Sequence, residues 1–122
     1  MLSTTLLLAA SMVVGQAEDV KSPAEHLKCL DGLIGKWVYK GPIQEGGSDM
    51  VENGTEIIVH ICWEPELGGN VIESEWDISA QGKQIDAGRN LIGWDPKENR
   101  IVSGGMGSHG GYSLGVITLS DD

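Results

Sequence analysis

The sequence predicts an all-β domain with one short N-terminal helix, arranged as an antiparallel up-and-down meander. Three observations support this prediction: a capped helical segment near residue 22, short stretches in which apolar and polar residues alternate, and turn residues between those stretches. Short hairpins that join consecutive strands produce a meander, and a twisted meander of this size tends to close into a barrel.

The first 17 residues predict a secretory signal peptide. They carry no charged side chain, and residues 6–14 form an apolar run broken only by Ser11. Gly15 and Ala17 have the spacing of a signal-peptidase site, so we expect cleavage after Ala17 and export to the periplasm or the cell exterior. A buried apolar helix is the alternative, since the run is shorter than the roughly 20 residues that span a bilayer. The expected organisation is a signal peptide at 1–17, a linker at 18–21 and one folded domain at 22–122.

The negative net charge of the chain makes anionic partners unfavourable. The chain has 18 acidic and 8 basic residues, a net charge of −10, and the acidic residues are scattered as on a solvated surface. Such a surface repels nucleic acid and anionic lipid, so we expect neither as a partner. We expect no membrane span in the mature chain and no cofactor, and the sequence does not specify an oligomeric state.

The helix is predicted from its capping residues. Ser22 at the N-cap, Pro23 at the first helical position and Glu25 at the third form a capping box. Leucines follow at three-residue spacing and give one apolar face over about three turns, which must dock on an apolar surface to be stable. Gly32 and Gly35 are candidates for the helix end, because glycine readily adopts the left-handed conformation found there.

Six strands are predicted from alternation with a period of two. In the second, Ile57, Val59, Ile61 and Trp63 share one face, and in the third Ile72, Ser74, Trp76 and Ile78 share one face opposite Glu73, Glu75 and Asp77. The predicted strands are residues 36–41, 55–64, 70–79, 84–94, 100–106 and 112–119.

The connections and the chain end complete this prediction. Residues 67–70, 80–83 and 95–99 have turn chemistry, whereas the longer polar segment 42–54 predicts a mobile loop or lid. Six strands leave two unpaired edges, and a barrel filled by side chains usually has about eight. We therefore expect a barrel that is incomplete at the C-terminus, the alternative being a complete six-stranded sheet whose gap the helix covers.

The helix followed by Gly35-x-Trp37 at the entry to the first strand resembles the opening of a lipocalin-like (calycin) barrel. The wider sequence, with HLKCLDGLIGKW at 26–37 and LIGWD at 91–95, is similar to a group of small exported bacterial proteins, largely of unknown function. The resemblance implies a tryptophan packed at the closed end of the barrel and covers residues 22–119. This chain departs from the lipocalin pattern in one respect. Lipocalins usually have an arginine late in the chain that stacks on the first-strand tryptophan, whereas the only arginines here are Arg89 and Arg100.

The tryptophans are the candidate ligand-contacting residues. Core packing is the ordinary role of a strand tryptophan, but ligand cavities are also apolar with a few polar groups. The candidate cavity lining consists of Trp37, Trp63, Trp76 and Trp94. The resulting hypothesis is an exported lipocalin-like barrel of unknown specific function that binds a small hydrophobic or amphipathic ligand.

Two other functions stay open at this point. An enzyme or enzyme-accessory domain would use polar groups at the barrel mouth, with Glu73, Glu75 and His60 as the candidate participants. A surface-interaction protein of the cell envelope would instead act through its exterior. We favour the binding module, because solvated carboxylates and a partly buried strand histidine are the simpler interpretations of the three residues.

Other reactive residues give weaker signals. His26 is expected on the helix and His109 in an exposed turn, and no second metal ligand stands at a suitable spacing. The glycine-rich segment 104–111 lacks the lysine and the strand-to-helix context of a phosphate-binding loop, so it indicates bulges and bends. For Cys29 and Cys62 we expect two buried thiols. A disulfide between them is the second alternative, and metal ligation is the least favoured.

Overall fold

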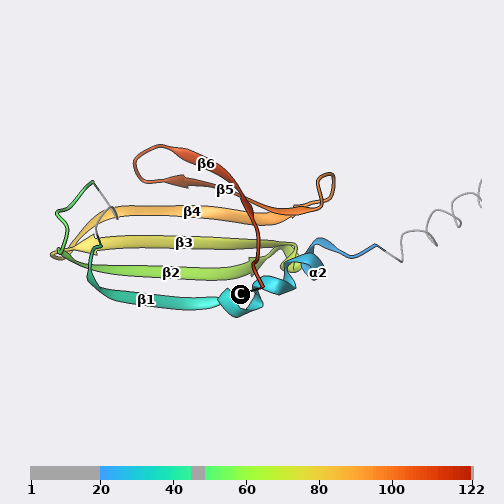
Figure 1. Ribbon diagram of the computed structural model, residues 1–122, viewed down its shortest axis with the longest axis horizontal. Helices are drawn as coiled ribbons and strands as arrows, with labels where there is room; N and C mark the ends of the chain where they lie inside the picture. Colours follow the sequence, from blue (N-terminus) through green and yellow to red (C-terminus); the bar gives the residue numbers. More distant parts are fainter. Residues whose placement is uncertain (1–19, 45–48, 122) are drawn as a thin grey trace, which may run out of the picture.

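The computed structural model describes residues 20–44 and 49–121 and contains a six-stranded antiparallel sheet with a short helical segment at one end (Figure 1). The strands lie in the sheet in the order in which they occur in the chain, which confirms the predicted meander. Each observed strand overlaps a predicted one and differs from it only at the ends. The strands are β1 (Gly35–Pro42), β2 (Glu56–Glu66), β3 (Val71–Ala80), β4 (Lys83–Asp95), β5 (Arg100–Gly107) and β6 (Tyr112–Ile117).

The edges of the sheet are β1 and β6. Within the described residues, β1 pairs only with β2, and β6 pairs only with β5. The sheet is therefore open in this part of the chain, and its closure into a lipocalin-like barrel stays a prediction.

The helical segment differs from the predicted three-turn helix. An α-helical turn, α2 (Pro23–Leu27), continues directly as a 3-10 helix, η1 (Lys28–Leu33). The predicted N-cap is present, because the Ser22 Oγ accepts a hydrogen bond from the Glu25 N–H at 3.2 Å. A 3-10 helix has three residues per turn, so it places Leu27 and Leu30 on the same side. Gly35 makes the exit with a φ of 130°, and Gly32 lies inside η1.

The strand register defines two faces of the sheet. Ile61 lies opposite Trp76 and Val59 opposite Ile78, so the predicted apolar faces of β2 and β3 coincide. We call this the covered face, since Leu27 and Leu30 pack on its isoleucines. The opposite side, which carries Glu73, Glu75 and Asp77 of β3, is called the groove face.

Two hydrophobic clusters lie at opposite ends of the covered face. The larger one joins the helical segment to the sheet and consists of Leu27, Leu30, Ile72, Ile92 and Ile101. The smaller one consists of Ile43, Ile57 and Ala80. Between them Trp37 is 50% exposed and Tyr39 is 46% exposed, so core packing of Trp37 is incomplete.

The segment between β1 and β2 is anchored where it is described. The Ile43 N–H donates to the Thr55 carbonyl at 2.8 Å, and the Gly54 N–H donates to the Ile43 carbonyl at 3.1 Å. Ile43 is buried against Ile57 in the smaller cluster, and Val51 packs beside them. The predicted lid at residues 42–54 includes residues 45–48, which lie outside the described residues.

Adjacent residues on β4 provide a test of the two faces. Ile92 is 2% exposed in the larger cluster, whereas Leu91 is 57% exposed on the groove face. We expect Ile92→Ala to lower the free energy of unfolding by about 2–5 kcal/mol, as for other buried aliphatic truncations. Leu91→Ala should change it by less than about 0.5 kcal/mol, as exposed substitutions usually do. Urea denaturation of both variants measures the difference, and equal losses would contradict the assignment of the faces.

Candidate functional site

An open groove of about 930 Å³ lies on the groove face and crosses strands β3 to β6. Residues from all four strands line it, together with Ser108 in the turn after β5. The lining residues used below are Glu73, Glu75, Trp76, Asp77, Arg89, Leu91, Met106, Tyr112 and Leu114. The groove therefore depends on the sheet register, which brings together residues far apart in the sequence.

Glycines in the middle of β4 and β5 leave space for the side chains of neighbouring strands. A Cβ atom at Gly88 would collide with the ring of Trp76, and a Cβ atom at Gly105 would collide with the side-chain oxygen of Asn90. On the groove face, a Cβ atom at Gly104 would lie 3.1 Å from the Leu114 Cδ2. These glycines leave room for their neighbours' larger side chains, which is a common reason for glycine within a strand.

One wall of the groove is apolar. Leu91 from β4, Met106 from β5, and Tyr112 and Leu114 from β6 form it, and these side chains are 57–82% exposed. Isolated apolar side chains are normal on a protein surface, but contiguous ones usually mark a binding surface. This wall is thus the best candidate for contact with an apolar ligand.

The other wall is charged. The Arg89 Nη2 lies 3.2 Å from the Glu75 Oε1, and the Arg89 Nε lies 4.0 Å from the Glu73 Oε1. Asp77 lies farther along β3 in the same lining. Two carboxylates therefore lie within 4.0 Å of one guanidinium, a third lines the same groove, and this side of the groove has an excess of negative charge.

Cys62 lies beside the charged wall, in a small hollow with Glu64, Glu73 and Glu75. Its thiol donates a hydrogen bond to the Glu64 Oε1 at 3.4 Å. Partial desolvation is the largest cause that raises the pKa of the Cys62 thiol, and the hydrogen bond to Glu64 raises it further. The thiol is therefore in its protonated, poorly nucleophilic form near neutral pH.

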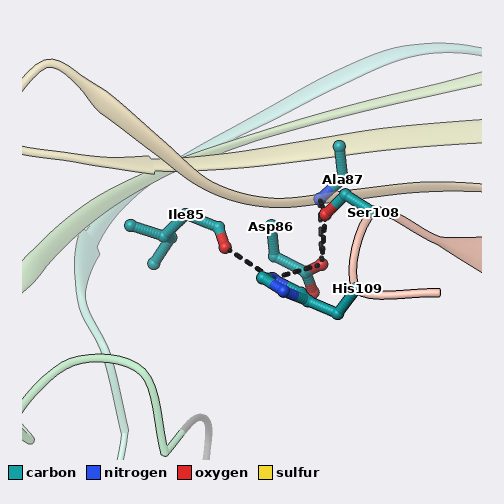
Figure 2. A network of polar contacts seen from close by, with 5 residues as sticks. All are labelled: Ile85, Asp86, Ala87, Ser108 and His109. Carbon is teal, nitrogen blue, oxygen red and sulfur yellow. Dashed lines mark hydrogen bonds and ion pairs between the residues drawn. The ribbon is translucent and has the colours of Figure 1, made fainter. Parts of the chain in front are cut away.

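A polar cluster fastens the tip of the β5–β6 hairpin to β4 (Figure 2). The Asp86 Oδ1 accepts hydrogen bonds from the Ala87 N–H at 2.9 Å and from the Ser108 hydroxyl at 3.3 Å. The His109 Nε2 lies 3.0 Å from the Ile85 carbonyl and 3.8 Å from the Asp86 Oδ1. Since a carbonyl only accepts, this nitrogen carries a proton in the observed contact.

The chemistry of this cluster is structural. A Ser-His-Asp triad requires the histidine to take the proton of the serine hydroxyl. Here the Ser108 hydroxyl is directed to Asp86, and the His109 Nε2 is directed to the Ile85 carbonyl (Figure 2). Gly110, with a φ of 89°, forms the turn, as expected for a bend in the glycine-rich segment.

The structure separates the four tryptophans predicted to line a cavity. Trp63 and Trp94 pack against the larger cluster, and the Trp94 ring stacks on His26 with a centroid distance of 3.7 Å. The Trp37 Nε1–H donates to the Leu33 carbonyl at 2.9 Å. Trp76 alone of the four is among the groove-lining residues, although the register places its side chain on the covered face with Ile61. Ligand contact by any of the four stays a prediction.

The remaining candidates are placed as follows. His60 is exposed on the groove face, which corrects the expectation of a partly buried histidine, because none of the described residues covers this part of the face. Cys29 and Cys62 are free, and Cys29 is exposed on η1, so the expectation of two buried thiols is wrong for Cys29. Leu27 and Leu30 occupy the side of the helical segment that meets the sheet, and Cys29 is directed away from it.

Sequence reasoning missed the residues of the apolar wall. Met106, Tyr112 and Leu114 were expected only as parts of strands, because alternation does not show which strand face lacks a cover. One signal was present: residues 101–120 contain no acidic residue, lysine or arginine, although the chain carries 18 acidic and 8 basic residues. A long uncharged segment in such a chain indicates a surface that meets something other than water.

Cysteine alkylation tests the environment of Cys62. Near neutral pH, iodoacetamide should modify Cys62 more slowly than exposed Cys29, because the raised pKa keeps the Cys62 thiol protonated to higher pH. Glu64→Gln removes the negative charge beside the thiol and should accelerate the modification. Peptide mass spectrometry over a pH series gives both rates, with Cys29 as the internal control. An unchanged Cys62 rate in the variant would show that Glu64 does not set the reactivity.

The described part of the chain has no helix that is both long and apolar enough to cross a membrane. It also has no group of three or more histidine, cysteine, aspartate or glutamate residues placed to hold a metal ion. Comparison with protein-family models, with curated proteins and with solved structures finds no match for this chain.

Proposed function

We propose that this protein is an exported, lipocalin-like binding module that holds a small amphipathic molecule with a cationic head group in the groove of its sheet. The capped helical segment, the Gly35-x-Trp37 entry to β1 and the six-stranded meander support the lipocalin-like relation. Export is supported by the composition of residues 1–17, which lie outside the described residues.

The observation that carries the proposal is the pairing of an apolar wall with a charged wall in one groove. The volume of about 930 Å³ is within the range of small-molecule sites, which is roughly 300–1,000 Å³. An amphipathic ligand would lay its apolar part along Leu91, Met106 and Leu114. Its head would then lie near Glu73 and Glu75 on the neighbouring strand.

The charge of the groove selects the sign of the head group. Arg89 neutralises one of the three carboxylates at most, and the chain as a whole has a net charge of −10. The guanidinium and the Glu75 carboxylate are both largely exposed, so their pair is weak and a ligand cation can compete for the carboxylate. A cationic head is therefore attracted and an anionic one is repelled.

The two alternative functions have less support. Catalysis by Glu73, Glu75 and His60 would need these groups held around a reacting atom. Glu75 is paired with Arg89, and His60 lies exposed two strands from Arg89. A purely surface-acting envelope protein would not need a groove with two chemically different walls.

The test is a titration with single-chain surfactants below their critical micelle concentrations. Dodecyltrimethylammonium should bind saturably and about tenfold more tightly than dodecyl sulfate, since exposed charges at contact contribute about 1 kcal/mol each. Isothermal calorimetry gives the affinities. Leu91→Lys adds a positive charge to the groove and should abolish cation binding.

Val38→Lys is the matched control. Val38 is 66% exposed on the groove face of β1, and it does not line the groove. This variant carries the same added charge and should bind the cationic surfactant nearly as well as the wild type. Equal loss of binding in both variants, or preference for the anionic surfactant, would contradict the proposal.

A further inference from the structure

The two edges of the sheet have opposite chemistry. β1 carries Lys36, Lys40 and Pro42, which are the residue types that prevent an exposed strand from pairing with another chain. β6 has the sequence YSLGVI, with no charge and no proline. Five of its six residues are exposed, so β6 is a strand edge without the usual protection.

The absence of charge extends over the β5–β6 hairpin from Ile101 onward. Between Arg100 and Asp121 the chain has no acidic residue, lysine or arginine, and His109 is held at the hairpin tip. Elsewhere the acidic residues are scattered over a chain with a net charge of −10. Two copies of this chain would repel each other at most contacts, and the uncharged hairpin is where they can approach closely.

The hairpin hydrogen bonds show which backbone groups of β6 have no partner strand among the described residues. The Gly107 N–H donates to the Gly111 carbonyl at 3.1 Å, so residues 107 and 111 form a hydrogen-bonded pair. Such pairs alternate along an antiparallel ladder, and Gly105–Ser113 and Ser103–Gly115 are therefore the next ones. The N–H and C=O groups of Tyr112, Leu114 and Val116 accordingly point away from β5.

We propose that β6 is a dimerisation edge, at which a second copy of this chain adds its own β6 in antiparallel orientation. The two-fold axis passes through Leu114, which lies opposite the partner's Leu114. Tyr112 then lies opposite Val116 of the partner subunit. In this register Tyr112, Leu114 and Val116, whose backbone groups point outward, all face the partner strand. Each of them then forms a hydrogen-bonded pair with the residue opposite it.

The side chains fit the same register. Tyr112, Leu114 and Val116 lie on one face of β6 and are 74%, 82% and 48% exposed. Across the two-fold axis they meet one another as apolar cross-strand pairs, which stabilise neighbouring strands. No like charges face each other within the paired strands. The dimer extends the sheet through β6 and leaves the groove face of each copy on the same side.

Sedimentation equilibrium of the full chain tests the proposal. The wild type should show a reversible monomer–dimer equilibrium, with dimer as its largest species. Leu114→Pro removes an outward-pointing backbone N–H and the Leu114 side chain at the edge, but no hydrogen bond to β5. The fold should therefore persist while the dimer dissociation constant rises at least about tenfold. Val116→Lys adds a positive charge to the edge of each copy and should give the same result. Circular dichroism verifies that both variants keep the sheet.

Leu91→Lys is the matched control, because Leu91 is exposed on the same face but lies on an interior strand. This variant should dimerise like the wild type. The register is tested by Leu114→Cys in a background with Cys29→Ser and Cys62→Ser, which should form an intermolecular disulfide under mild oxidation, whereas Leu91→Cys should not. A wild-type chain that stays monomeric, or dimers that survive both edge substitutions, would overturn the proposal.

Discussion

The packing of Leu27 and Leu30 against the isoleucines of β3, β4 and β5 is the contact on which the rest of this structure depends. The two leucines, together with Ile72 and Ile92, are 2–3% exposed, which are the lowest values in the larger cluster. A sheet with one unprotected apolar face is not stable in water, and a helical segment of about three turns is not stable alone. Each element therefore supplies the surface that the other requires.

Covering one face has a consequence for the other. The helical segment occupies the covered face, and the groove face has no covering element in the described residues, so its side chains meet solvent. Leu91 and Met106 are exposed there next to the ion pair of Arg89 and Glu75. A surface that is apolar on one side and acidic on the other suits an amphipathic partner better than either a purely apolar or a purely ionic one.

The β5–β6 hairpin links the groove to the edge of the sheet. Tyr112 and Leu114 contribute side chains to the groove, and their backbone groups point along the plane of the sheet to the open edge. The side chains and the backbone of the same strand can thus serve different contacts, because they project in perpendicular directions. Asp86 and Ser108 hold the hairpin tip on β4 and fix the position of both surfaces.

The local structure can be predicted from the sequence alone. Ser22 and Pro23 marked the helix start, and alternation located all six strands and the shared face of Ile61 and Trp76, because capping and side-chain period are local properties of the chain. Which surfaces stay uncovered depends on tertiary contacts. Trp37 proved half exposed and Leu114 became part of a groove, since exposure depends on neighbours supplied by distant segments, and periodicity carries no information about them.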